Sequence, residues 1–214
     1  MKKIFLILTL LLLVNGCSFK NPPNKWQYNS ADSFESYKNN FYYGYDTLAQ
    51  KDLNKAIEDA KKSADITTLA RIYLGTCAVH ISVGMDDNCS NYTEIANIQE
   101  LAEEKSLDAY YSFITHSIQK QQIPLLPKRY QNFARLLNEG AIQEAIEDMH
   151  EMDSISSKLL SASLVKEKLS IKDIKKVINS ASFYGYKKAG LYWLEILQKR
   201  LQNKNKEKGQ KTLR

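Results

Sequence analysis

The sequence predicts an all-α protein built as an array of antiparallel helical hairpins. Proline is absent between Asn24 and Ile123 and again after Pro127. Apolar residues recur at steps of three and four throughout the chain, which places them on one face of a helix that must be buried. Runs of alternating apolar and polar residues are too short to indicate a strand.

An aromatic stripe predicts the first helix. Its residues, spaced by three or four, are Phe34, Tyr37, Phe41, Tyr45 and Leu48. The next two helices are expected to begin at the N-cap residues Asp52 and Asp65, whose short polar side chains accept hydrogen bonds from free backbone amides. Gly84 is suited to the turn that ends the third helix.

N-cap, turn and proline residues predict the later helices in the same way. Ser106, Asp153 and Ser170 are N-cap candidates, Gly140 is suited to a turn, and Pro124 and Pro127 indicate a break followed by a new helix. The helices are expected near 31–50, 52–63, 65–83, 92–105, 106–121, 127–138, 141–151, 153–168, 170–179 and 181–202.

The chain also repeats itself. The segment 55–59 matches 144–148 at an offset of 89 residues. A third related segment, 172–178, resembles 51–57 and lies about 32 residues after the corresponding part of the second copy, 140–146. With the small and aromatic residues of 181–194, this pattern resembles tetratricopeptide or Sel1-like helical repeats. The resemblance implies stacked helix pairs with a concave face, and a non-repetitive helical bundle is the alternative.

The N-terminus carries a secretory signal. Two lysines precede eleven residues, 4–14, that are apolar except for one threonine, and Asn15, Gly16 and Cys17 follow. Val14, Gly16 and Cys17 resemble the lipobox of bacterial lipoproteins, from which Asn15 departs. The resemblance implies cleavage before Cys17, acylation of that residue and, because Ser18 is not aspartate, sorting to the outer membrane. An ordinary cleaved signal and an uncleaved anchor are the alternatives, although a membrane span needs about 20 apolar residues.

Four regions follow from these patterns. They are a signal peptide (1–16), a lipidated cysteine with a spacer (17–30), a helical domain (31–202) and a basic tail expected to be disordered (203–214). The net charge of +6 comes from the two ends, since residues 18–197 contain 21 basic and 23 acidic side chains. A body without a basic excess argues against nucleic acid as a partner.

The two remaining cysteines, Cys77 and Cys89, are expected to form a disulfide in an oxidising envelope compartment. A metal site that combines both thiols with His80 and a pair of free thiols are the alternatives. Between the cysteines, Asp86 to Ser90 resembles the extended acceptor sequence of bacterial N-glycosylation. This resemblance makes Asn88 a possible glycosylation site.

No catalytic group can be assigned from the sequence. The three histidines lie in different predicted helices without a metal-ligand spacing, and phosphate-binding loops and nucleophile elbows are absent. We therefore expect a protein that is not an enzyme and has no metal and no cofactor.

Aromatic residues outside the predicted stripe are the candidates for partner binding. They are Tyr42, Tyr43, Tyr184 and Tyr192, and the alternative is that neighbouring helices cover them. The resulting expectation is a lipoprotein anchored to the outer membrane through Cys17, facing the periplasm and acting as a scaffold or assembly factor for an envelope protein. A surface-exposed adhesin and a cell-wall enzyme are the alternatives.

Overall fold

The computed structural model describes residues 25–212, and all regular secondary structure in that range is helical. The predicted all-α class and the hairpin array are therefore confirmed, whereas the predicted signal peptide and Cys17 lie outside the described residues. The helices are α2 (Lys25–Tyr43), α3 (Asp46–Lys62), α4 (Ile66–Ser82), α5 (Ser90–Thr93), α6 (Gln99–Ala102), α7 (Lys105–Ile114), α8 (Lys128–Asn138), α9 (Ile142–Glu151), α10 (Ile155–Leu164), α11 (Ile171–Phe183) and α12 (Lys187–Thr212), with 3₁₀ turns η1 (Lys120–Leu125) and η2 (Lys166–Lys168).

Three hairpins share the same turn. The turns of α2–α3, α8–α9 and α11–α12 each contain a glycine with a left-handed backbone: Gly44 (φ 84°), Gly140 (φ 75°) and Gly185 (φ 69°). In each turn, the amide after the glycine donates to the carbonyl five residues earlier, over 2.8 to 2.9 Å. Glycine adopts this conformation without the steric cost that a Cβ atom brings, so it ends the first helix of each pair.

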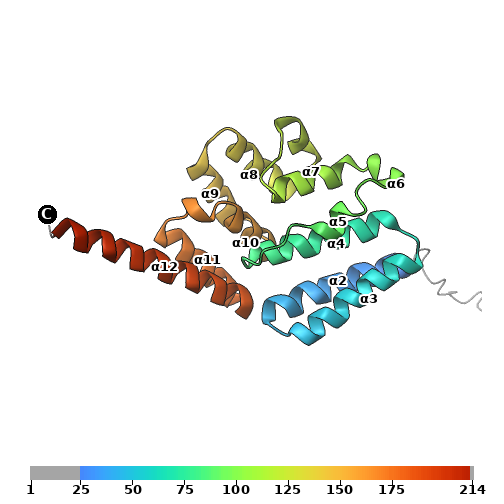
Figure 1. Cartoon of the computed structure of the whole chain (residues 1–214), viewed down its shortest axis with the longest axis horizontal. Coiled ribbons are helices and arrows are strands. Elements are labelled where there is room, and N and C mark those ends of the chain that lie inside the picture. Colours follow the sequence, from blue (N-terminus) through green and yellow to red (C-terminus); the bar gives the residue numbers. More distant parts are fainter. Residues whose placement is uncertain (1–24, 213–214) are drawn as a thin grey trace, which may run out of the picture.

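The core surrounds α4. This helix packs against α2 and α3 on one side and against α7 and α10 on the other, as Figure 1 shows. Its largest buried apolar side chains include Ile72 and Leu74. A smaller buried cluster of Ala56, Ala60, Leu69 and Ile72 joins α4 to α3.

The first and last hairpins also touch each other. The Tyr186 hydroxyl at the start of α12 donates to the Asn39 side chain of α2 over 2.9 Å, and Lys188 forms an ion pair with Asp46. The array therefore joins its two ends, as Figure 1 shows for α2 and α12.

The first predicted helix boundary is wrong. The sequence predicts one helix over 31–50, but the chain turns at Gly44, and α3 already begins at Asp46. Asp52 is consequently not an N-cap and instead accepts a hydrogen bond from the Asn40 side chain at 2.7 Å. Beyond the turn, Tyr45 and Leu48 are exposed rather than part of the buried stripe.

The region after the disulfide also differs. The predicted helix over 92–105 is only two single turns, α5 and α6, and the helix predicted to reach 121 ends at Ile114. A left-handed residue, His116 (φ 61°), follows that end. Ser106 and Asp153 are not N-caps, because the helices start one or two positions away. Asp65 and Ser170 are confirmed as N-caps, since their side chains accept from the amides of Thr68 and Asp173.

Helical structure extends beyond the predicted domain at both ends. It starts at Lys25 rather than 31, and α12 continues to Thr212 where a disordered tail was expected from 203. Lysine, glutamine and glutamate are good helix formers, and no proline interrupts them. Within the described part of the chain, no helix combines the length and the apolar character that a membrane span requires.

The three related sequence segments do not all occupy the same position within a hairpin. Segments 55–59 and 144–148 lie in α3 and α9, each the second helix of its pair. The segment from Lys172 begins in α11, the first helix of its pair. Only the first two segments therefore occupy equivalent places in the array.

Candidate partner-binding surface

Two identical tripeptides form the turns of the first and last hairpins. The sequence Tyr-Gly-Tyr occurs at 43–45 and again at 184–186, each with its glycine in the left-handed conformation. This repetition is a signal that the periodicity argument missed, because the helical spacing of apolar residues continues across both tripeptides and gives no sign of a turn. Since α2 packs against α12, the two turns lie side by side.

The rings of these turns form one continuous series. Tyr186 lies at its centre, with its ring centroid 5.4 Å from Tyr43 and 6.0 Å from Tyr184. Tyr45 extends the series from Tyr43 at 5.9 Å, and Phe183 extends it from Tyr184 at 5.3 Å. Two loops that are about 140 residues apart in sequence thus build a single aromatic surface.

Much of this surface is open to solvent. Phe183 is 85% exposed, and Tyr43, Tyr45 and Tyr184 are also exposed. We call these four residues the aromatic patch. Exposed clusters of large apolar rings are uncommon on monomeric proteins and are typical of contact sites, where tyrosine is enriched.

Tyr186 supports the patch from below. It is buried, and burial raises the pKa of Tyr186 to about 12. Its ring stacks on Tyr42 with a centroid distance of 4.7 Å and an interplanar angle of 13°. The exposed rings therefore rest on a packed base, so a partner would meet an already ordered surface.

Tyr42, one of the predicted partner-binding residues, is buried and cannot contact a partner in this structure. It is only 1% exposed, and its hydroxyl shares a 2.8 Å hydrogen bond with Ser82 of α4. Burial raises the pKa of Tyr42 well above its usual range. Because α2 ends at Tyr43, Tyr42 takes the inward position and Tyr45 the outward one, the reverse of what a longer helix predicts.

The other predicted tyrosines separate into two groups. Tyr43 and Tyr184 belong to the aromatic patch, on the two neighbouring turns. Tyr192 does not join them: it is half-buried, and its ring covers Gly84 at the end of α4. The structure thus brings two of the four candidate residues together and assigns the other two to packing.

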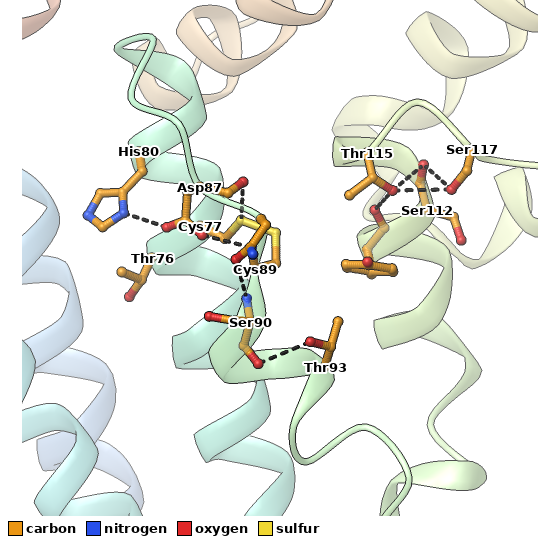
Figure 2. The surroundings of a disulfide bond; sticks show 12 residues. Thr76, Cys77, His80, Asp87, Cys89, Ser90, Thr93, Ser112, Thr115 and Ser117 are labelled. Carbon is orange, nitrogen blue, oxygen red and sulfur yellow. Dashed lines mark hydrogen bonds and ion pairs between the residues drawn. A yellow bond between two sulfur atoms is a disulfide. The ribbon is translucent and has the colours of Figure 1, made fainter.

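The predicted disulfide is present in the structure. Cys77 of α4 is bonded to Cys89, with their Cα atoms 5.3 Å apart (Figure 2). The chain leaves α4, turns at Gly84 and returns to place Cys89 beside it. Closing a loop of this size stabilises a protein by about 3 kcal/mol in the chain-entropy model.

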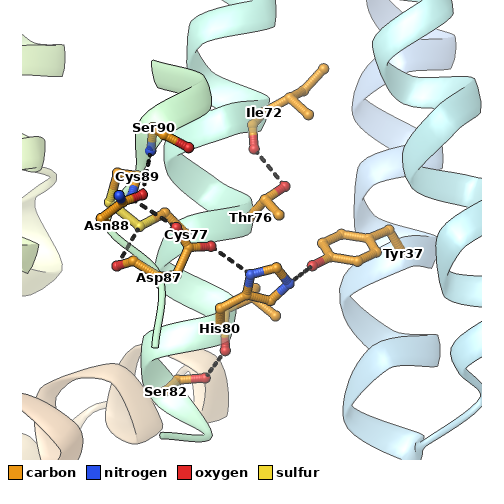
Figure 3. Close-up of polar contacts among 11 residues, drawn as sticks. Tyr37, Ile72, Thr76, Cys77, His80, Ser82, Asp87, Asn88, Cys89 and Ser90 are labelled. Atoms are coloured by element: carbon orange, nitrogen blue, oxygen red, sulfur yellow. Dashed lines mark hydrogen bonds and ion pairs between the residues drawn. A yellow bond between two sulfur atoms is a disulfide. The ribbon is translucent and has the colours of Figure 1, made fainter. Parts of the chain in front are cut away.

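Asp87 holds the loop that the disulfide closes. One of its carboxylate oxygens accepts from the Cys89 amide at 2.8 Å, and the other lies 2.6 Å from Nδ1 of His80. Nε2 of His80 lies 3.2 Å from the Tyr37 hydroxyl of α2, as Figure 3 shows. The sequence did not predict this pairing, since His80 and Asp87 are on a helix and a loop respectively.

The order Asp87, His80, Tyr37 is similar to an acid–base relay, but its last member is poorly suited to react. Tyr37 is buried, and burial raises the pKa of its hydroxyl well above the usual range. A phenol that keeps its proton and has little solvent access is a weak nucleophile. The three residues are better explained as a polar connection between the disulfide loop and α2.

A metal at the cysteines would compete with the disulfide. The ligand atoms of Cys77, Cys89 and Asp87 lie within 4.8 Å of one another. The third ligand atom in this group therefore belongs to Asp87 and not to His80, which was the expected third ligand. Both sulfur atoms are already used in the disulfide, and a metal ligand must be a thiolate. The oxidised protein therefore offers only the carboxylate here.

Asn88 lies on the exposed side of the same loop. Its side-chain oxygen accepts a hydrogen bond from the Ser90 amide at 3.1 Å, and the residue between them is the bonded Cys89. A glycosyltransferase would therefore have to act on an ordered turn. Glycosylation of Asn88 stays a prediction.

A second histidine is paired with an aspartate across two helices. Nε2 of His150, in the last turn of α9, lies 3.1 Å from Oδ1 of Asp173 in the first turn of α11. Burial lowers the pKa of His150 and outweighs the opposite effect of Asp173. Burial alone raises the pKa of Asp173, but hydrogen bonds from Ser170 and His150 outweigh it, so the net shift is downward.

A hollow of about 460 Å³ lies between α4, α7 and α8. Arg71 and Arg129 stand on its walls, and apolar residues such as Leu107 and Leu126 line it. Its size is in the range of ligand sites, and its two guanidinium groups suit an anionic group on a partner.

Together these features define a disulfide-linked helical-hairpin protein with an exposed aromatic surface at one end of its first helix. No protein-family model matches the chain, and no curated protein and no solved structure is significantly similar to it.

Proposed function

We propose that this chain is a lipid-anchored, non-enzymatic interaction scaffold of the bacterial cell envelope, which binds a protein partner through the aromatic patch. The observation that carries the proposal is the exposure of Phe183 and its neighbours on two ordered turns. Burying such rings against a partner removes apolar surface from water at low entropic cost, because the turns are already fixed.

Other observations agree with a location outside the cytoplasm. Residues 1–17 resemble a lipoprotein signal with Cys17 as the acylated residue, and the Cys77–Cys89 disulfide suits an oxidising compartment. We propose that the body, with its tetratricopeptide-like or Sel1-like hairpins, faces the periplasm from the outer membrane.

A photo-crosslinking experiment tests the partner surface. A benzophenone amino acid replaces Phe183 in cells of the native host, and the matched control carries it at Ile98, which is also exposed but lies directly before α6, away from the patch. We expect a crosslinked protein adduct from position 183 that is absent from position 98. Equal labelling, or none from position 183, would contradict the proposal.

Protease treatment of intact cells separates the two lipoprotein alternatives. A periplasmic scaffold is expected to resist the protease until the outer membrane is opened. Digestion of the protein on intact cells would instead favour the surface-exposed adhesin.

A further inference from the structure

We infer that the N-terminal end of α2 rests on the lipid bilayer, with Trp26 and Tyr28 in the headgroup region. This inference rests on the proposed acylation of Cys17, and it adds a second membrane contact that the folded body itself makes. It also fixes which end of the molecule faces the lipid.

The first turn of α2 exposes two aromatic side chains. Trp26 is 45% exposed and Tyr28 is 61% exposed, although a globular protein buries most of its tryptophan surface. The Cα atoms of both residues lie within about 5 Å of that of Lys25 along the helix axis, at 1.5 Å per residue. The helix end, rather than one side of the helix, therefore presents them to the surroundings.

Lysines surround these rings. Lys25 is exposed, and because α3 runs antiparallel to α2, its last residues Lys61 and Lys62 are exposed at the same end. Nζ of Lys62 lies 5.5 Å from the centre of the Trp26 ring. Tryptophan, tyrosine and lysine are the residues that gather at membrane interfaces, where rings sit among headgroups and ammonium groups reach the water.

The acidic groups at this end limit the role of charge. Lys62 lies 3.7 Å from Glu58 and 3.9 Å from Asp59, while Asp65 accepts from the side chain of Gln27 at 3.0 Å. Lys62 is therefore largely balanced, and acidic side chains accompany the lysines at this end. We expect the aromatic rings to supply most of the lipid contact, so it should depend little on salt concentration.

The length of chain before α2 makes a lipid surface the occupant rather than a protein. Eight peptide steps separate Cys17 from Lys25, and even fully extended they span only about 29 Å. Acyl chains at Cys17 would thus hold the end of α2 close to the bilayer at all times. Figure 1 shows the described chain beginning at this end of α2, with the other end of the helix beside α11 and α12.

The arrangement has a consequence for the aromatic patch. Trp26 and Tyr43 are separated by 17 residues of one helix, or about 26 Å along its axis. If the start of α2 rests on the lipid, the patch is held away from the bilayer and stays accessible to a partner in the aqueous space.

Tryptophan fluorescence tests this inference, because the chain has two tryptophans and Trp193 is 0% exposed. The acylated full-length protein is reconstituted into vesicles of phosphatidylethanolamine and phosphatidylglycerol, with and without bromine on the acyl chains near the headgroup. We expect brominated lipid to quench part of the emission and to leave the Trp26→Phe variant unquenched. A matched control adds Leu48→Trp to Trp26→Phe, which places an exposed tryptophan near the other end of the hairpin, and it should also stay unquenched.

The possible outcomes distinguish failure of the proposed α2–lipid contact from failure of the proposed acyl anchor. If the wild type remains on the vesicles but is quenched no more than Trp26→Phe, the contact by α2 is wrong while the acyl anchor stands. Quenching of the Leu48→Trp control as strong as that of the wild type would overturn the end-on orientation. If mass spectrometry finds no acyl chains and the protein does not float with vesicles, the proposed anchor and the inference built on it both fail.

Discussion

At the scale of single residues, the burial of His150, which its pairing with Asp173 only partly offsets, makes stability depend on pH. The pKa of His150 is lowered from its ordinary value of 6.5, so the unfolded chain binds a proton more readily than the folded one. Stability is therefore full above about pH 6.5 and falls as the pH drops below that value. The lowered pKa of Asp173 acts in the same direction, but only as the pH falls below its ordinary value of 3.8.

The prediction is that His150→Gln loses less stability than the wild type between pH 7.5 and pH 5. Urea denaturation at the two pH values measures this, and glutamine can still donate a hydrogen bond to Asp173. The matched control is His116→Asn, which removes an exposed histidine but keeps a residue that tolerates its left-handed backbone (φ 61°). An unchanged pH dependence in His150→Gln would show that another group is responsible.

At the scale of helices and turns, helix existence was easier to predict than helix ends. The periodic segments over 65–83, 127–138 and 141–151 match α4, α8 and α9 within a few residues. Each of these helices carries an apolar stripe and borders a turn glycine, Gly84 after α4 and Gly140 between α8 and α9, so sequence and tertiary packing agree.

The first hairpin was predicted less well for a physical reason. The spacing of Phe41, Tyr45 and Leu48 continues the helical period across Gly44, but the left-handed glycine ends the helix there. The aromatic patch depends on that turn, and no periodicity argument can place two turns next to each other when they are about 140 residues apart. The repeated Tyr-Gly-Tyr is the local signal that could have suggested it.

The turn glycines yield the second prediction. Gly84 and Gly140 have similar φ values of 70° and 75°. Because both lie in the left-handed region, replacing either with alanine should lower the free energy of unfolding by about 1 kcal/mol or more. A Cβ atom on Gly84 would also overlap the Tyr192 ring, whereas no atom lies within 4 Å of one on Gly140. We expect Gly84→Ala to lower the free energy of unfolding by about 1–3 kcal/mol more than Gly140→Ala.

Urea denaturation of both variants measures that difference, and a double-mutant cycle with Tyr192→Ala identifies its cause. In the Tyr192→Ala background, Gly84→Ala should cost no more than Gly140→Ala does. Equal costs in the wild-type background would mean that the Tyr192 ring moves aside freely and does not fix α12 against α4.

At the scale of the whole molecule, contact between the ends distinguishes this protein from an open solenoid. In an open array each repeat touches only its neighbours, so the terminal hairpins unfold most easily. Here Tyr42 stacks on Tyr186, and the Tyr186 hydroxyl bonds to Asn39, which joins the first hairpin directly to the last. The same contacts support the aromatic patch, so the proposed partner surface and the closure of the array depend on one set of residues.

Removing the Tyr186 side chain should therefore loosen the first hairpin selectively. We expect Tyr186→Ala to lose about 3–5 kcal/mol, as for other large buried aromatic truncations, and Tyr186→Phe about 1 kcal/mol from the lost hydrogen bond. Hydrogen exchange followed by mass spectrometry should show faster exchange in α2 and α3 for Tyr186→Ala than for Tyr130→Ala, which removes a buried tyrosine of α8 instead. The physical reason is that Tyr186→Ala removes both the stack on Tyr42 and the hydrogen bond to Asn39, which join α2 to the last hairpin. If both alanine variants accelerate exchange evenly along the chain, the ends are not coupled through Tyr186, and the aromatic patch would have to be ordered by each turn separately.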